Sequence, residues 1–400
     1  MKIVIGEGSC GLAAGAGKVH AKLDELFAAS NPTNAVVTIT SCIGMCFVEP
    51  IVDVYEDNGT LHRLVRVKEE DAATIHDAVT SGDLSKLEPL TISAEDASYT
   101  NPAQVQEFED ASFLEKQTRI ALRNCGIINP MSIDEYIEKG GYEALKKVLG
   151  GMTQDDVIEE IDKSGLKGRG GAGFSTAFKW RAAKASQGTE KYLICNADEG
   201  DPGAFMDRAV IEGDPHTLIE GMLIGAYAIG AQEAIVYVRA EYPLAIVRLE
   251  NAIKEATDRG FLGDHIMGSD FSCKMRIKAG AGAFVCGEET ALIESLEGKR
   301  GMPRLKPPFP AQSGYWFKPS NINNVETYAN VAWIISNGGD AFAAMGTPDS
   351  KGTKVFALTG KIKRGGLVEI PMGKTLREVI YDIGGGIREP GSELSVRDSK

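Results

Sequence analysis

A glycine-rich run in the middle of the chain, residues 168–174 (GRGGAGF), constrains the fold more than any other feature. Five of the nine residues 165–173 are glycine. Such a backbone can approach a ligand closely, its consecutive amides can point at phosphate oxygens, and Arg169 or Lys179 could add positive charge. The run predicts the phosphate-binding loop of a nucleotide- or flavin-using redox protein. An ordinary glycine-rich turn between two elements is the alternative.

The bulk properties are those of a globular protein. The chain has 400 residues, 43% hydrophobic and 25% charged, which is enough for two or three domains. Its formal net charge of −13 argues against a nucleic-acid or anionic-membrane partner, because these surfaces select clustered Lys and Arg. No run approaches the roughly 20 apolar residues of a membrane span, and no secretion signal opens the chain.

Seven cysteines, an odd number, do not indicate a disulfide framework. We therefore expect a cytoplasmic protein, without direct membrane insertion, whose thiols are structural, catalytic or metal-binding.

Hydrophobic periodicity and turn-forming residues predict an α/β protein of several units. We expect a first domain over 1–90, a linker over 91–105, a large α/β domain over 106–345 and an incomplete β-rich unit over 350–400. The expected strands lie at 2–5, 35–40, 51–54, 61–67, 192–197, 234–238, 272–279, 354–358 and 365–370, and the expected helices at 16–29, 117–125, 132–138, 142–149 and 376–383.

A second glycine motif lies at the N-terminus. Residues 6–11 (GEGSCG) have the spacing G-x-G-x-x-G after a predicted strand and before a helix, as a dinucleotide-binding turn requires. That turn also needs a carboxylate at the end of the second strand to bind the ribose, whereas this strand runs into residues 38–42 (TITSC). The sequence therefore disfavours a Rossmann site here.

Three cysteines explain the N-terminal region better. Cys10 lies in the glycine motif, and Cys42 and Cys46 form a C-x3-C pair in a loop after a strand. Closely spaced thiols on turns can share one metal centre. The arrangement resembles the thioredoxin-like [2Fe-2S] ferredoxin fold, in which a C-x4-C pair and a C-x3-C pair hold one cluster. Ile5 stands at the position of the fourth ligand, so another residue completes the centre, or the fold persists without it, or these are ordinary buried cysteines.

Three further regions of the large domain are rich in small and polar residues. Residues 195–205 (CNADEGDPGAF) follow an apolar strand, where carboxylates and amides can accept hydrogen bonds from sugar or ribityl hydroxyls. Residues 280–290 (GAGAFVCGEET) end in paired carboxylates that open a helix. A basic, aromatic loop at 304–310 precedes an amide-rich turn at 321–327. Solvated acidic turns are the alternative interpretation of the carboxylates.

Together these segments resemble the NADH-oxidising, flavin-carrying subunit of respiratory complex I and its soluble relatives in NAD-dependent and electron-bifurcating hydrogenases and formate dehydrogenases. The resemblance covers about residues 117–327. The N-terminal part resembles the ferredoxin module fused in the soluble hydrogenase type, and 354–387 resembles the ubiquitin-like β-grasp domain of the family. The resemblance implies an FMN-dependent NADH:acceptor oxidoreductase, a diaphorase.

The resemblance also implies roles for individual residues. Those on family positions around the FMN phosphate, ribityl chain and ring are Gly168, Gly170, Lys179, Asn196, Asp198, Glu199, Phe284, Gly287, Glu288, Asn323, Asn324 and Thr327. Those on or near positions that hold NADH are Phe174, Asp201, Glu289, Lys306 and Phe309, with Phe309 suited to adenine stacking. No protein acid or base is implied, because the cofactor carries the hydride chemistry.

Three departures from the family pattern bear on function. Phe284 stands where a Tyr is common, which removes a hydroxyl near the flavin. Asp201 stands where many relatives have Glu, and its carboxylate would repel a 2′-phosphate, so we expect a preference for NADH over NADPH. The family's cysteines for a [4Fe-4S] cluster have no counterpart, since no cysteine follows Cys286.

The implied partners are iron–sulfur electron-transfer subunits of a hydrogenase, a formate dehydrogenase or a complex I-like assembly. The first cluster to receive electrons from FMN would belong to such a partner or to the site of Cys10, Cys42 and Cys46. A non-catalytic scaffold or assembly subunit that keeps the flavin fold is the alternative function. A thioredoxin-like thiol oxidoreductase is disfavoured, because C-x3-C differs from C-x-x-C.

Overall fold

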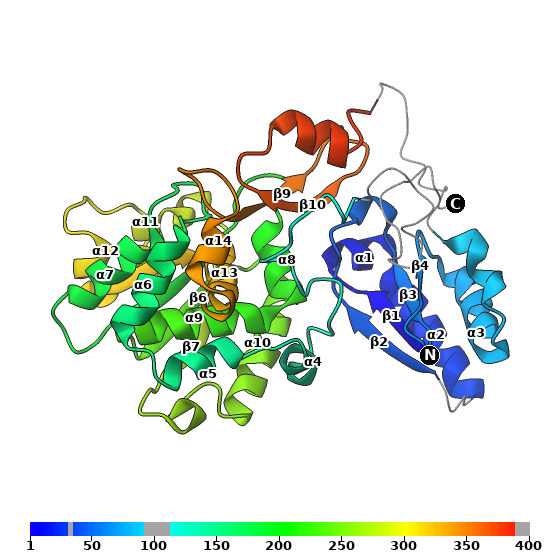
Figure 1. Cartoon of the computed structure of the whole chain (residues 1–400), viewed down its shortest axis with the longest axis horizontal. Helices are drawn as coiled ribbons and strands as arrows, with labels where there is room; N and C mark the ends of the chain where they lie inside the picture. Colours follow the sequence, from blue (N-terminus) through cyan, green and yellow to red (C-terminus); the bar gives the residue numbers. More distant parts are fainter. Residues whose placement is uncertain (31–34, 92–112, 389–400) are drawn as a thin grey trace.

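The computed structural model describes residues 1–30, 35–91 and 113–388. In these ranges the chain forms three sheets with accompanying helices, which is the expected α/β class (Figure 1). The predicted linker 91–105 lies outside the described residues except for Thr91, as does the end of the 350–400 unit from residue 389 onward.

The first sheet belongs to the N-terminal part of the chain. It contains β1 (Lys2–Gly6), β2 (Val36–Thr40), β3 (Val52–Tyr55) and β4 (Leu61–Leu64) in the order β2-β1-β3-β4. β2 is parallel to β1, whereas β3 is antiparallel to both β1 and β4, as the thioredoxin-like arrangement requires. The helices of this unit are α1 (Ser9–Ala14), α2 (Ala16–Ser30) and α3 (Ala72–Ser81).

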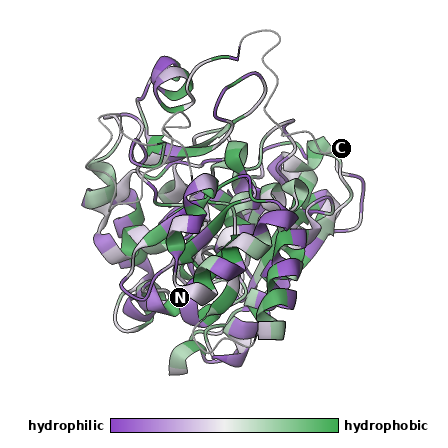
Figure 2. Cartoon of the chain, turned by 90° about the vertical axis from the view of Figure 1, so that its right-hand side faces the viewer, coloured by the Kyte–Doolittle hydropathy of each residue, from purple (hydrophilic) through white to green (hydrophobic). Residues whose placement is uncertain are grey.

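The N-terminal unit has its own apolar core. In α2 the buried residues Val19, Leu23 and Phe27 are spaced four apart, so they share one face, and they pack in one cluster with Ile3 and Ile5 of β1. Figure 2, which faces this end of the molecule, shows helices that carry both hydrophobic and hydrophilic residues along their length. Each fully buried large apolar side chain contributes about 1.5–3 kcal/mol to such a core.

The second sheet is entirely parallel. It contains β5 (Tyr192–Ala197), β6 (Glu233–Arg239), β7 (Lys274–Gly280) and β8 (Ser320–Asn324) in the order β7-β6-β5-β8. The chain progresses from β5 through β6 to β7 on one side and then returns to place β8 on the other side of β5. Open parallel sheets bind ligands where this order reverses, beyond the carboxyl ends of the strands. The topology therefore predicts a ligand-binding crevice beyond the carboxyl ends of β5 and β8.

Helices surround the second sheet (Figure 1). They are α4 (Ile133–Glu138), α5 (Glu143–Leu149), α6 (Gln154–Ser164), α7 (Thr176–Ala185), α8 (Met206–Gly213), α9 (Pro215–Ile229), α10 (Pro243–Asp258), α11 (Glu289–Leu296), α12 (Pro310–Ser313), α13 (Val325–Asn337) and α14 (Gly339–Ala343). α9 is buried almost all round, as a helix can be only inside a protein. Among the described residues, none of the helices combines the length and apolar character needed to cross a bilayer.

A third, two-stranded sheet pairs β9 (Thr353–Leu358) with β10 (Gly366–Pro371) in antiparallel fashion, followed by a π-helical segment, Glu378–Ile383. In Figure 1 this pair lies above the junction of the other two units. It is bonded to the loop that carries two of the cysteines: Leu367 N donates to Gly44 O at 2.9 Å, and Phe47 N donates to Gly365 O at 3.1 Å. The β9–β10 pair and the N-terminal unit are therefore joined at this loop.

One expected helix is wrong. Residues 117–125 form turns, not a helix. The backbone amides of Ala121 and Leu122 donate to the two carboxylate oxygens of Glu369 in β10, at 3.0 and 2.9 Å. Because a buried side chain from a strand far along the sequence binds these amides, local periodicity could not predict the outcome.

Candidate functional site

The glycine-rich loop connects α6 to α7 and is closed at its base, where Gly168 N donates to Phe174 O at 2.8 Å. Gly171 and Gly173 adopt φ angles of +109° and +63°, which L side chains rarely adopt. A Cβ atom built on either residue would meet none of the described atoms within 4 Å. The crest of the loop is therefore open to a ligand.

The glycine-rich loop is fixed on the junction between β8 and α13. A Cβ atom on Gly170 would lie 3.2 Å from Asn324 Cβ, so this close approach suits glycine. Arg169 N donates to Thr327 Oγ1 at 2.9 Å. Thr327, which is predicted from the sequence to lie around FMN, positions the loop in this way.

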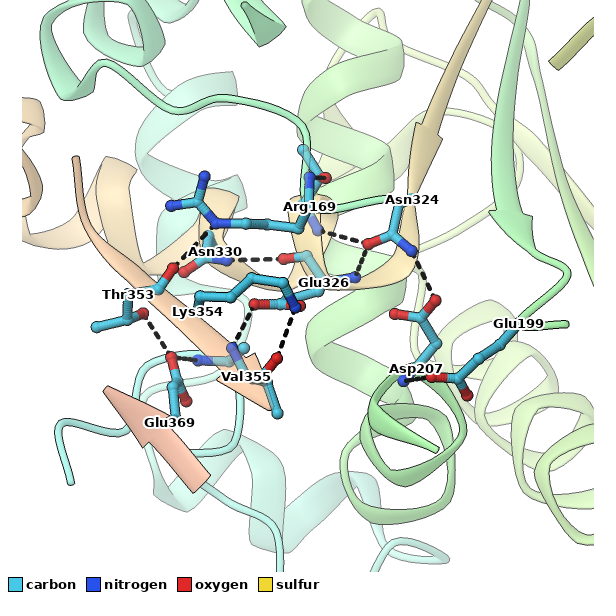
Figure 3. A network of polar contacts seen from close by, with 12 residues as sticks. Arg169, Glu199, Asp207, Asn324, Glu326, Asn330, Thr353, Lys354, Val355 and Glu369 are labelled. Carbon is cyan, nitrogen blue, oxygen red and sulfur yellow. Dashed lines mark hydrogen bonds and ion pairs between the residues drawn. The ribbon is translucent and has the colours of Figure 1, made fainter. Parts of the chain in front are cut away.

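The guanidinium of Arg169 does not supply charge to the loop. It is buried, and it donates to the backbone oxygens of Thr353 at 2.9 Å, Lys351 at 2.7 Å and Lys167 at 2.8 Å (Figure 3). Arg169 thus anchors the loop to the start of β9. Of the two cations considered from the sequence, Lys179 on α7 remains the candidate for phosphate binding.

Asp198 directly follows β5 and has one carboxylate oxygen without a partner among the described residues. Asn196 orients the turn: its Nδ2 donates to Gly287 O at 2.8 Å, and its Oδ1 accepts from Asp198 N at 3.1 Å. Oδ2 of Asp198 is buried and accepts no hydrogen bond from any described residue. Burial raises the pKa of Asp198 to about 6. Buried polar atoms are almost always hydrogen-bonded, so this oxygen fits a hydroxyl donor on a ligand.

Two lysines and two glutamates form a chain of ion pairs at the start of α11. Lys306 Nζ lies 2.9 Å from both Glu288 Oε1 and Glu289 Oε1, and Lys179 Nζ lies 3.1 Å from Glu289 Oε2. Glu288 also caps the helix by accepting from Thr290 N at 2.8 Å. Burial opposes ionisation of Glu288, but the bonds from Thr290 and Lys306 outweigh it and lower its pKa to about 2. Both glutamates are therefore held as anions.

The asparagines at the end of β8 form hydrogen bonds within the protein. Asn323 Oδ1 accepts from Trp180 Nε1 at 3.1 Å, and Asn324 Oδ1 caps α13 by accepting from Glu326 N at 2.9 Å. Asn324 Nδ2 donates to Asp207 Oδ2 at 2.6 Å (Figure 3). Asp207 could not be found from the sequence, because no motif marks this buried carboxyl in the first turn of α8.

Glu199 is directed toward α8. Its carboxylate accepts from Asp207 N at 3.1 Å and from Arg208 N at 3.2 Å, two of the first amides of that helix (Figure 3). This is helix capping, which satisfies amides that lack an intrahelical partner. Glu199 is predicted from the sequence to lie around FMN; the side chain links the crevice to α8, and direct contact with FMN stays a prediction.

Exposed aromatic side chains lie on loops of the same domain. Phe174, Phe284 and Phe309 are 54%, 66% and 54% exposed. Phe284 packs over Gly200, where a Cβ atom would lie only 2.5 Å from the ring, and Asp201 follows on the same exposed turn. Exposed aromatic faces suit the stacking of nucleotide rings. Phe284 thus packs against the loop after β5. Lys306 forms an ion pair with Glu289.

The three N-terminal cysteines lie together, although they come from two segments. Their Sγ atoms are all within 4.8 Å of one another, and those of Cys42 and Cys46 are 3.6 Å apart. Three clustered thiols form a donor set that suits an iron–sulfur centre. The cysteine site faces α8. Phe205 and Arg208 line the same small hollow as Cys10 and Cys42. The other residues that line this hollow are Ser9, Ser41, Ala209, Glu212 and Leu367.

The glycine motif at residues 6–11 forms an internal contact. Ser9 opens α1, and its backbone N and its Oγ donate to the carboxylate of Glu212 at 2.9 and 2.5 Å. A carboxylate of the same chain thus occupies the position that a dinucleotide phosphate would need. The structure agrees with the rejection of a Rossmann site here.

An all-parallel sheet with an open glycine loop and an unpartnered carboxylate at its switch point defines the class: an α/β redox protein that binds a flavin or nucleotide. Comparison with known families gives the particular type. Residues 161–333 match the Nuo51 FMN-binding domain of the complex I 51K family. The central part of this chain is therefore similar to the Nuo51 FMN-binding domain.

Similar proteins agree with this assignment. The chain is 63% identical over 271 residues to the NADP-reducing hydrogenase subunit HndC of Solidesulfovibrio fructosivorans, covering 68% of this chain and 55% of that protein. It is 55% identical over 255 residues to an NADH-quinone oxidoreductase subunit of Aquifex aeolicus, covering 64% of this chain and 59% of that protein. The chain thus spans less than two thirds of the length of these relatives.

A solved structure extends the similarity to almost the whole chain. A chain of the NAD+-reducing [NiFe]-hydrogenase in the H2-reduced state matches with a TM-score of 0.58 and 30% identity. The match covers 96% of this chain and 60% of the other. The N-terminal unit and the β9–β10 unit are therefore included in the shared fold.

Proposed function

We propose that this chain is the NADH-oxidising diaphorase subunit of a larger redox assembly, with FMN bound in the crevice between β5 and β8. The single observation that carries the proposal is the buried, unpartnered Oδ2 of Asp198 directly after β5, within residues that match an FMN-binding domain. FMN, when bound, supplies hydride acceptance from NADH and single-electron release.

The residues around the crevice divide by chemistry. The amides of the loop from Gly168 to Gly173, with Lys179, suit the FMN phosphate. Asp198 suits a ribityl hydroxyl, because its free oxygen accepts a hydrogen bond. Asn196 and Gly287 hold that carboxylate in place, and Asn323, Asn324, Thr327 and Glu199 position the surrounding loops and helices.

The nucleotide side of the site is assigned to the exposed aromatics and the ion-pair chain. Phe174 and Phe309 offer exposed faces for stacking, and Lys306 and Glu289 provide charged donors and acceptors. Asp201 is exposed and would repel a 2′-phosphate, so we assign NADH as the preferred substrate, although one relative is named for NADP reduction.

The partners proposed are iron–sulfur subunits of a hydrogenase, a formate dehydrogenase or a complex I-like assembly in the cytoplasm. The relatives are named as subunits of hydrogenases and of NADH-quinone oxidoreductase, which supports an assembly of this kind. We propose that electrons leave FMN for an iron–sulfur cluster of such a partner or for the site of Cys10, Cys42 and Cys46.

Flavin analysis and a diaphorase assay test the proposal. The purified chain, incubated with FMN and desalted, should retain about one FMN per chain and catalyse NADH–ferricyanide reduction. An Asp198→Ala variant should bind FMN more weakly with its far-ultraviolet circular dichroism unchanged. Failure of the folded wild-type chain to retain FMN or to oxidise NADH would instead support the scaffold alternative.

A further inference from the structure

A buried carboxyl group lies beside the three clustered cysteines. Glu49 is 9% exposed and lies three residues beyond Cys46. Its Oε2 accepts from Ile51 N at 2.9 Å, whereas its Oε1 is buried and accepts no hydrogen bond from any described residue. No ion pair involves Glu49 in the part of the chain that the structure describes. A carboxylate this isolated is costly to bury unless a cation or donor binds it.

The Glu49 carboxyl faces the loops that carry the cysteines. A Cβ atom on Gly11, the residue after Cys10, would lie 3.1 Å from Glu49 Oε2. The Cys42 side chain lies within hydrogen-bonding reach of the Glu49 carboxyl group. The Glu49 carboxyl group therefore lies beside the segments that carry Cys10 and Cys42.

Glycines bring the Cys10 loop close to the other two cysteines. A Cβ atom on Gly8 would lie 2.7 Å from Cys42 N, and one on Gly11 would lie 1.9 Å from Gly6 O. A side chain at position 8 would force the Cys10 and Cys42 segments apart, whereas the Gly11 contact closes the turn from Gly6 to Gly11 within the Cys10 segment. The loops are thus built for a close approach that places Cys10 against the C-x3-C pair.

Ile5 cannot complete the donor set. It has no metal-binding atom, it is fully buried, and it packs in the apolar core with residues of α2. An iron–sulfur cluster of the [2Fe-2S] type needs four protein ligands, of which three thiols are present. Carboxylate oxygen also binds iron, although it is a harder donor than thiolate sulfur.

We propose that Glu49 is the fourth protein ligand of a [2Fe-2S] cluster whose other ligands are Cys10, Cys42 and Cys46. The inference goes beyond the diaphorase function, since it concerns the N-terminal unit and stands whether or not the crevice binds FMN. Glu49 replaces the missing cysteine by approaching from the segment after the C-x3-C loop. The exchange keeps four anionic ligands and changes one donor atom from sulfur to oxygen.

Spectroscopy of the full chain tests this assignment. After anaerobic reconstitution with ferrous iron and sulfide, the wild-type chain should hold iron and sulfide in equal amounts. Glu49→Cys should retain the cluster, because it supplies a thiolate, and should gain thiolate-to-iron absorption and shift the electron paramagnetic resonance g-values of the reduced state. Glu49→Ala should lose at least half of the iron.

Two comparisons keep the test decisive. Glu56→Gln, a change of another carboxylate in the N-terminal unit, should leave the iron content and spectrum unchanged, and FMN content with circular dichroism reports folding in every variant. Full iron and identical resonance spectra in both Glu49→Cys and Glu49→Ala would overturn the ligand role of Glu49. One tightly bound zinc ion without sulfide in the wild-type chain would overturn the iron–sulfur assignment.

Discussion

The buried carboxyl group of Asp198 destabilises the fold when it is ionised, and we propose that the same group binds FMN. Its pKa lies near 6 in the folded chain, above the ordinary value near 3.8, because burial disfavours the charged form. Because this pKa is higher in the folded than in the unfolded chain, the Asp198 carboxyl keeps its proton to a higher pH in the folded state. The free energy of unfolding therefore decreases as the pH rises from about 4 through 6. The FMN-free protein therefore carries a destabilising anion at neutral pH.

The Asp198→Asn variant should remove the loss of folding stability that the ionised Asp198 carboxylate causes. At pH 7.5 the FMN-free variant should be more stable than wild type by about 1 kcal/mol, a value discounted because the group is only half buried, and at pH 3.5 the difference should vanish. Its affinity for FMN should fall about tenfold, since one acceptor is lost. Thermal unfolding at both pH values and fluorescence titration with FMN measure these effects, with exposed Asp201→Asn as the stability control.

We propose that Asp201 sets the nucleotide preference through its negative charge. Replacing it with Asn should raise the ratio of kcat/KM for NADPH to that for NADH by about tenfold, which corresponds to about 1.4 kcal/mol of removed repulsion. FMN content should not change. Steady-state ferricyanide assays with both nucleotides at low ionic strength provide the measurement. An unchanged ratio would place the 2′-phosphate away from this carboxylate.

At the scale of elements, α8 joins the crevice to the cysteine site. Glu199 caps its first turn, and Glu212 near its end accepts two hydrogen bonds from Ser9. Arg248 of α10 adds a bond from its guanidinium to Glu7 O at 2.6 Å. The helix is thus a short, buried connection between the two units.

The Glu212→Ala variant should loosen this connection. Loss of the two bonds to Ser9 leaves a partly buried amide without its partner, which costs about 1 kcal/mol. Hydrogen exchange should increase over residues 6–14 and 40–48, while the amides of β5 and β6 keep their protection and FMN stays bound. Glu250→Gln, an exposed carboxylate on α10, serves as the control. Uniform loss of protection throughout the chain would mean that α8 is not a local junction.

Three strands of the parallel sheet could be predicted from sequence: 192–197 agrees with β5, 234–238 lies within β6, and 272–279 overlaps β7. β8 could not, because its residues 320–324 (SNINN) are mostly polar and indicate a turn. The donor set at Cys10, Cys42 and Cys46 could also be predicted, since thiol spacing is a local signal. The turns at 117–125 could not, because Glu369 binds their amides from another unit. The inward position of Arg169 could not be predicted for the same reason, because its guanidinium binds backbone oxygens of Lys351 and Thr353, far along the sequence.

At the scale of the whole molecule, the flavin crevice and the cysteine site lie in different units, so their chemistry should be separable. Cys42→Ser should abolish iron binding but leave NADH–ferricyanide activity within about twofold of wild type, because ferricyanide can accept electrons at the crevice. Iron analysis and the diaphorase assay on the same preparation measure both. A parallel loss of diaphorase activity and iron would show that the cysteine site is required for NADH oxidation.

The central claim is that the β5–β8 crevice holds an FMN that NADH reduces. An anaerobic titration of the FMN-loaded chain with NADH, followed by visible absorption, tests it most directly. We predict that the flavin band near about 450 nm, a typical position for oxidised flavin, bleaches with about one NADH per FMN. A flavin that stays oxidised in excess NADH, in a chain that is folded and retains FMN, would contradict the claim.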